Sequence, residues 1–371
     1  MPTRRQHFVP RVYIKAWETE VTNRNEPDKI FQGVYYHGTN ESDGKTKESI
    51  LWKPHLYTIG FRHSFVCKSC PKVKSEFVDM IYNYLRESEN PVYGKYGYSI
   101  IKTKRSIEKH LLQIQDWQFF YDDGNVARKN SILNYIDSLN SYVLESAFDD
   151  FFEKNWEKTY TDFVDAVRFG KPFALESSER VIPTEIAENM LSAFFIMLCR
   201  NPSFDAMGIY SSIKNNVLYP VFKDIFQDTT AGNDSTTGQD FADELMEGAW
   251  HTELYRMFYK KTGGFYHNII EKSLAGLQMV LFETYDGAGS FITSDNPAFE
   301  HKLVVETDNN NGFVFPISPK YLIFIARGNE GINVVDYRFA NMDTIRHFNR
   351  LTALHKTEAV ISNQADISRL F

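Results

Sequence analysis

The chain has 371 residues, of which 43% are hydrophobic and 15% aromatic, so a large core is expected and overall disorder is excluded. Its formal net charge of −7 disfavours a general duplex binder, which normally carries a basic excess, and only the start of the chain is locally basic (Arg4, Arg5, Arg11 and Lys15). Three cysteines do not suit a disulfide framework, no apolar run reaches the roughly 20 residues that cross a bilayer, and no secretory signal is visible. We therefore expect a cytoplasmic protein.

Short elements are expected first, followed by helices. Pro10 favours a short helix over residues 11–18, the run KIFQGVYY predicts a strand, and a second strand would include Leu51 and Trp52. Apolar residues at helical spacing predict helices over 75–89 and 106–121, and one long helix or two over 130–167.

The most apolar helix is predicted over residues 185–200. Thr184 is its expected N-cap, and Asn201-Pro202 is its stop signal. The breadth of its apolar face indicates a central position in the fold. After it, the small polar residues 229–239 predict a mobile loop, and residues 240–260 predict another helix.

The hydrophobic period changes from residue 277 onward. The runs LQMVLFET, SFIT, KLVVE, GFVFPI and YLIFIA predict strands of one antiparallel sheet, closed by a helix over 342–354 and a strand over 358–361. We therefore predict an α+β fold in which a C-terminal antiparallel sheet packs on a large helical middle. We expect one compact unit over 1–371, made of an N-terminal motif and strands (1–70), the helical middle (74–275) and the sheet with its closing helix (277–371).

Three polar residues are candidates for chemistry. His7 follows Gln6 and precedes a Pro-started helix, so it could act as a general base or simply anchor the terminus. Asp295 lies in a Ser-Asp-Asn-Pro turn after an apolar strand, where it could orient a histidine, hold a metal, bind an arginine, or form an Asx-turn. Arg200 ends the central helix and could bind a phosphate or carboxylate, or interact with the helix dipole.

A fourth group combines Cys67 and Cys70, spaced as Cys-x-x-Cys, with His55 and His63 upstream. These four side chains could form a Cys2His2 zinc site, but the second half of a usual zinc pattern is missing, so a surface loop with two thiols is the competing interpretation. A redox pair is disfavoured without a βαβ context. The chain also lacks GxxxxGK[ST], GxGxxG after a strand, HExxH and GxSxG, which disfavours P-loop, Rossmann and α/β-hydrolase chemistry.

Three of these runs together resemble a largely bacterial family, the domain of unknown function 4238. Its members open with a run like QHxVPxxYL, here QHFVPRVYI; carry a helix that ends in Arg-x-Pro, here Arg200-Asn201-Pro202; and then show an SDNP turn and a Pro-Leu/Ile-Ser-Pro element, here Pro316-Ile317-Ser318-Pro319. The order matches over nearly the whole chain. The resemblance implies that His7, Arg200 and Asp295 form one cluster, and it supplies no reaction. The group around Cys67 does not belong to that pattern.

The specific hypothesis is a nuclease-like hydrolase that cleaves phosphodiester bonds in RNA or DNA, in the manner of a toxin or an anti-phage defence effector. In it, His7 is the general base or acid, Asp295 orients it or holds a divalent metal, and Arg200 binds an anionic group. The expected substrate-binding residues are Gln6, Arg11, Tyr13, Ser294 and Asn296.

Two alternatives use the same residues without catalysis. The cluster could recognise a small anionic ligand or a peptide terminus as a binding or sensor module, with residues 229–239 closing over it. It could also be structural, a buried His–Asp–Arg network that joins the parts of the fold.

Overall fold

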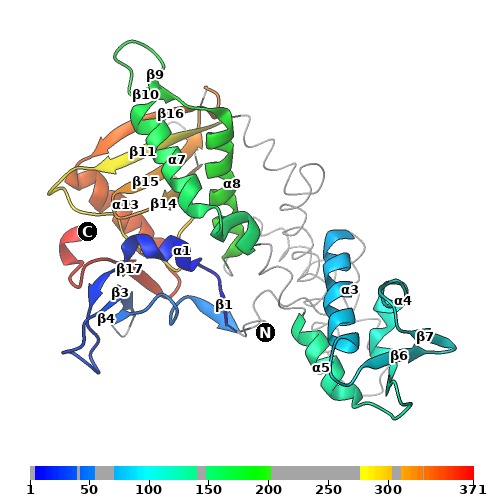
Figure 1. The fold of residues 1–371 in the computed structure, drawn as a ribbon. Coiled ribbons are helices and arrows are strands. Elements are labelled where there is room, and N and C mark those ends of the chain that lie inside the picture. The colour runs from blue at the N-terminus through cyan, green and yellow to red at the C-terminus, as the bar shows by residue number, and fades with distance from the viewer. Residues whose placement is uncertain are drawn as a thin grey trace, which may run out of the picture. The chain divides into compact units, whose positions relative to one another are not determined.

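The computed structural model describes residues 5–39, 42–54, 71–139, 148–201, 276–302, 311–328 and 330–371. The chain divides into two compact units. Unit 1 consists of Met1–Gln6, Pro54–Phe148 and Asp205–His267, and unit 2 consists of His7–Lys53, Asp149–Phe204 and Asn268–Phe371. The expectation of one unit over 1–371 stays a prediction. Figure 1 shows the elements of both units.

Unit 1 contains helices and a small antiparallel sheet. Its elements are α3 (Pro71–Arg86), β6 (Val92–Tyr96), β7 (Ser99–Ile101), α4 (Lys104–His110), the 3-10 helix η2 (Leu111–Asp116), β8 (Gln118–Tyr121) and α5 (Lys129–Leu139), and the strand order is β7-β6-β8. The helix expected over 106–121 is therefore wrong at its C-terminal end. The aromatic run Gln-Phe-Phe-Tyr instead pairs with β6, where Trp117 and Phe119 are buried, because aromatic residues suit a half-buried pleated surface.

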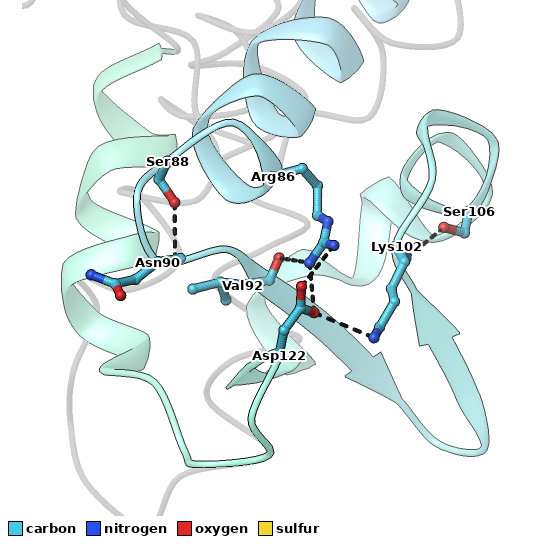
Figure 2. A network of polar contacts seen from close by, with 7 residues as sticks. All are labelled: Arg86, Ser88, Asn90, Val92, Lys102, Ser106 and Asp122. Carbon is cyan, nitrogen blue, oxygen red and sulfur yellow. Dashed lines mark hydrogen bonds and ion pairs between the residues drawn. The ribbon is translucent and has the colours of Figure 1, made fainter.

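A polar network joins the end of α3 to this small sheet (Figure 2). Arg86 donates from both terminal nitrogens to the two carboxylate oxygens of Asp122, at 2.9 and 3.0 Å, and Lys102 contacts the same carboxylate at 3.3 Å. Arg86 also reaches the carbonyl of Val92 at 3.4 Å. The Arg86 guanidinium, followed by Lys102, keeps the pKa of the Asp122 carboxyl below its usual value. Because these groups are partly exposed, the network orients α3 more than it stabilises the unit.

Unit 2 is built on a seven-stranded sheet. Its strands, in spatial order, are β13 (Phe299–Lys302), β14 (Asn311–Pro316), β15 (Tyr321–Arg327), β11 (Leu277–Thr284), β16 (Val334–Ala340), β10 (Glu179–Val181) and β9 (Lys171–Pro172). The pairs are antiparallel except β11 with β16, which run parallel. The prediction of one antiparallel sheet is therefore correct for β14, β15 and β11. The predicted strand KLVVE lies outside the described residues except for Lys302, and β13 and β16 are not predicted from the sequence.

Helices cover both faces of this sheet (Figure 1). On one face, Phe194 of α8 (Thr184–Arg200) lies 5.3 Å from Phe313 and 5.8 Å from Phe315, measured between ring centroids, and α7 (Trp156–Phe169) lies beside α8. On the other face, Phe348 of α13 (Met342–His355) contacts Phe324 at 6.0 Å, in a cluster that also contains Val314, Phe282 and Leu322. The alternation of Phe313, Val314 and Phe315 between the two faces is the period-2 pattern of a strand.

A second sheet in unit 2 joins the beginning and the end of the chain. Its order is β12 (Thr293–Ser294), β17 (Ala359–Ser362), β3 (Phe31–Gly38) and β2 (Thr19–Val21), with β4 (Ser42–Lys45) paired to β3. The run SFIT therefore leads into this sheet rather than into the larger one. Beside it lie α1 (Arg11–Ile14) and the 3-10 helix η1 (Lys15–Trp17). The strands β1 (Arg5–His7) and β5 (Trp52–Pro54) pair with each other, and each has residues assigned to both units. Several strand and helix predictions, including α13 and β17, are confirmed within two residues.

The long pattern over 130–167 is divided. It begins with α5, and after residues outside the described ranges it continues as a short π-helix, η3 (Asp149–Glu153), and α7. For α8, the N-cap is Pro183 and not Thr184, which is the first helical residue. The loop over 229–239 and the helix over 240–260 lie outside the described residues. None of the helices within the described ranges combines the length and the apolar character needed to cross a membrane.

Candidate functional site

The C-terminal end of α8 is the centre of the candidate site. Ten residues of this helix are buried, which fixes it against the sheet, and the chain leaves it at Asn201 in an extended conformation because Pro202 follows. Arg200 is 3% exposed. Its Nε and Nη2 atoms donate to the backbone carbonyl of His7 at 3.1 and 2.5 Å, and Nη2 lies 3.0 Å from Oε1 of Glu153 in the π-helix. A cation at this position also suits the negative end of the helix dipole.

His7 therefore contacts Arg200 through its backbone carbonyl, and its imidazole takes no part in this interaction. The ring is half-buried, and its Nε2 atom is enclosed without a hydrogen-bond partner among the residues that the structure describes. Burial first, and then the charge of Arg11, lower the pKa of His7 below 6.5, although the backbone of Glu48 raises it in part. The imidazole is thus neutral at pH 7, with a nitrogen able to accept a proton.

Asp295 makes its contacts with the chain that follows α13. Its two carboxylate oxygens accept backbone N–H groups of Thr357 and Glu358, at 2.9 and 2.5 Å, and its own N–H donates to the carbonyl of Ala359. The side chain is 2% exposed. Burial raises the pKa of Asp295 above its usual value, and the N–H donors offset part of that rise. This arrangement connects the SDNP turn to the start of β17.

The neighbours of Asp295 complete that connection. Ser294 is buried, and its hydroxyl donates to the carbonyl of Asn296 and accepts from its N–H. The Asn296 amide donates to the carbonyl of His355 at 3.0 Å. Asn201 in turn donates to the carbonyl of Asp295 at 2.8 Å and to the side-chain oxygen of Asn296 at 3.1 Å. The Arg-Asn-Pro and Ser-Asp-Asn-Pro runs are thus in direct contact.

Tyr13 and Trp17 attach the N-terminal helices to the same region. The Tyr13 hydroxyl donates to the carbonyl of Pro316 at 2.5 Å and lies 2.7 Å from the hydroxyl of Thr293. The Trp17 indole donates to the carbonyl of Phe291 at 3.0 Å. Both aromatic side chains are 0% exposed, and burial raises the pKa of Tyr13. Tyr13 of the QHFVPRVYI run thus contacts the residue before the SDNP turn and the first residue of the Pro-Ile-Ser-Pro element.

The remaining candidates are more varied. Gln6 is buried in β1, whereas Arg11 is exposed on α1 with its charge near His7. The possible zinc ligands Cys67, Cys70, His55 and His63 lie outside the described residues. Within the ranges that are described, no group of three or more His, Cys, Asp or Glu side chains could hold a metal ion.

Sequence reasoning missed Glu153 and Asn349. Glu153 pairs with Arg200. In the sequence, the one indication of a buried role is that this acidic residue directly follows two phenylalanines. Asn349 of α13 is 1% exposed, and its amide bonds to the N–H of Ile292 and to the carbonyls of Ser290 and Leu370. A polar residue on the buried face of a periodic helix was the available signal for it.

Comparison with known families decides the relationship of the chain. The model of a family described as "Protein of unknown function (DUF4238)" matches residues 5–366. The chain belongs to this family. A search of curated proteins and a search of solved structures each found no match. The family relationship covers both units and names no activity.

Proposed function

We propose that this member of the DUF4238 family is a nuclease-like hydrolase that cleaves phosphodiester bonds with His7 as its general base. The observation that carries the proposal is the Nε2 atom of His7, which is enclosed without a hydrogen-bond partner among the described residues. An enclosed polar atom without a partner costs free energy, so it calls for an explanation. A proton transferred from an attacking water or ribose hydroxyl would give this nitrogen its partner.

The charges around His7 suit an anionic substrate. Arg11 and Arg200 both act on the imidazole by their charge, and Arg11 is exposed on α1. Arg200 is paired with Glu153, which leaves Arg11 as the cation available to a phosphate. As the oxygen nucleophile bonds to phosphorus, its proton would pass to His7. The ester bond between phosphorus and the leaving oxygen would break, and a water molecule would protonate that oxygen. RNA and DNA are the proposed substrate classes.

The contacts of Arg200 and Asp295 favour positioning roles within this proposal. Arg200 binds the carbonyl of His7, so it fixes the backbone that carries the imidazole. Asp295 uses both carboxylate oxygens for the N–H groups of Thr357 and Glu358. We therefore assign neither residue to substrate contact. A toxin or anti-phage effector in the cytoplasm is the setting in which such an activity would be expected.

The same contacts favour a second candidate, a purely structural role for the cluster. Arg200, Asn201 and Asp295 satisfy backbone groups of distant segments, which is what a scaffold network does. In that case, the imidazole of His7 only fills space beside β1. A binding or sensor role stays the third alternative, and ligand-induced stabilisation without product would favour it.

A cleavage assay distinguishes these candidates. Wild type, His7→Ala and His7→Gln would be incubated with labelled tRNA, single-stranded RNA and DNA in Mg²⁺, Mn²⁺ or EDTA, and melting temperature would be followed in parallel. The matched control is His347→Ala, which alters an exposed histidine on α13. We expect cleavage by wild type and by the control, and a loss of at least about 100-fold in both His7 variants at unchanged melting, because a general base contributes about 10²–10⁴-fold.

Two other outcomes would reject the proposal. Absence of cleavage by wild type on all three substrates removes the nuclease assignment. Equal cleavage by wild type and His7→Gln removes His7 from the chemistry. If the His7 variants lose several degrees of melting temperature together with activity, the structural candidate explains the cluster better.

A further inference from the structure

Two histidines lie in contact beside the SDNP turn, away from the contacts of His7. His301 belongs to β13, and His355 is the last residue of α13. The Nδ1 atom of His301 lies 3.2 Å from the Nε2 atom of His355, and the two ring planes are at 88°. Both side chains are half-buried, so water can reach the pair.

The separation of these nitrogens fits two ligands of one metal ion. Imidazole nitrogens that each lie about 2.0–2.1 Å from a zinc ion at a tetrahedral angle are about 3.3 Å apart. A hydrogen bond between two neutral rings has a similar length, so the distance alone suits either arrangement. A strand and a helix end carry the two rings and hold them at this separation.

Two contacts hold His355 in place, and two more fix the chain that follows it. Its ring stacks on Phe299 of the same strand as His301, with centroids 4.4 Å apart and planes at 15°. Its carbonyl accepts the amide of Asn296, and the N–H groups of Thr357 and Glu358 bind Asp295. The SDNP turn therefore positions the histidine pair, and a pre-organised pair of imidazoles has less ordering entropy to lose when it binds an ion.

The chemistry of the two side chains also suits a metal. Imidazole binds transition-metal ions through a ring nitrogen, and both rings are open to water on one side. Imidazole ligands suit zinc, copper and nickel, and affinity at a given site rises toward copper.

We propose that His301 and His355 form a binding site for a divalent transition-metal ion. The pair supplies two protein ligands. Among the described residues, no group of three or more His, Cys, Asp or Glu side chains could bind a metal, so no third protein ligand is assigned. Water or a ligand oxygen would fill the other positions, which leaves the ion open to a further molecule. This site is independent of the hydrolase proposal, since neither histidine belongs to it.

The test is metal binding by the untagged full-length chain after chelator treatment. Zn²⁺ and Cu²⁺ would be titrated calorimetrically into wild type, His301→Ala, His355→Ala and the exposed-histidine control His347→Ala. We expect each pair variant to bind one ion fewer, or to bind it at least about tenfold more weakly, because one of two ligands is lost. The control should match wild type. Comparison of stoichiometry also separates this site from metal bound elsewhere in the chain.

A second measurement covers the case in which a variant fails to fold. Electron paramagnetic resonance of wild type with one equivalent of Cu²⁺ should show two coordinated nitrogens, and that signal should be lost in the folded His301→Ala or a folded His301→Gln protein. Identical isotherms for wild type and both pair variants would overturn the proposal. So would a Cu²⁺ spectrum with fewer than two nitrogens. If no metal binds to this pair, the hydrolase proposal is unaffected, because the cleavage assay tests His7. If no cleavage is found, the metal-site proposal is unaffected for the same reason.

Discussion

Replacing Arg200 by alanine tests how much of unit 2 depends on the end of α8. The change removes both donors to the carbonyl of His7 and the ion pair with Glu153. Arg200 is 3% exposed and the Glu153 side chain 19%, so the His7 carbonyl and the Glu153 carboxylate lose this partner in a largely enclosed place. Breaking a buried ion pair by removing one partner costs about 3–5 kcal/mol. We therefore expect Arg200→Ala to lower the free energy of unfolding by about 3–5 kcal/mol.

The assay is urea unfolding followed by circular dichroism, with the midpoint and the slope reported separately. Arg350→Ala, an exposed arginine on α13, is the matched control and should change stability by no more than about 0.5 kcal/mol. Glu153→Gln and the double variant complete a mutant cycle, in which the double change should cost less than the sum of the two single changes. A loss below about 1 kcal/mol for Arg200→Ala would refute the assignment of these contacts to the scaffold.

Three further results are expected. Tyr13→Phe should cost about 1–3 kcal/mol in urea unfolding, because the carbonyl of Pro316 loses a buried donor, and a neutral result would show that water replaces it. Gly94→Ala should destabilise unit 1 by about 1–3 kcal/mol, since a Cβ there would lie 2.6 Å from the fully buried Trp117, and an unchanged melting curve would mean that the indole moves freely. The lowered pKa of His7 means that the unfolded chain binds a proton more readily below pH 6.5, so stability should fall as pH falls below that value. His7→Gln should flatten this part of the stability–pH curve, and an unaltered curve would contradict the lowered pKa.

The secondary structure was predictable where one hydrophobic period runs without interruption. The apolar face of α8 and the alternation of β11 and β15 have that property, and the structure confirms both. The helix expected over 106–121 is wrong after Asp116, because tertiary pairing with β6 uses the aromatic run as a strand. The parallel pairing of β11 with β16 had no local signal, because the hydrophobic pattern of a strand does not indicate the direction of its neighbour.

The sequence predicted a cluster of residues, and it did not predict the contacts that these residues make. Motif order indicated that His7, Arg200 and Asp295 lie near one another, and Arg200 does bind the carbonyl of His7. Arg200 binds the backbone carbonyl of His7 and not its imidazole. Which of these two groups faces Arg200 depends on the path of the backbone, and residue types do not encode that path. Glu153 and the pair of His301 and His355 carry no spacing signal, because their partners lie in other elements.

The attachment of the N-terminal helices has a consequence for the order of folding during synthesis. Trp17 donates to the carbonyl of Phe291, which is 274 residues later, and Tyr13 bonds to a carbonyl 303 residues later. At roughly 5–20 residues per second, the ribosome would add the partner of Trp17 about 14–55 s after Trp17 itself. The first segment of unit 2 must therefore wait with its aromatic side chains unburied while unit 1 is made. A nascent chain arrested before Phe291 should be a preferred client of chaperones, and release of the last strands should end that dependence.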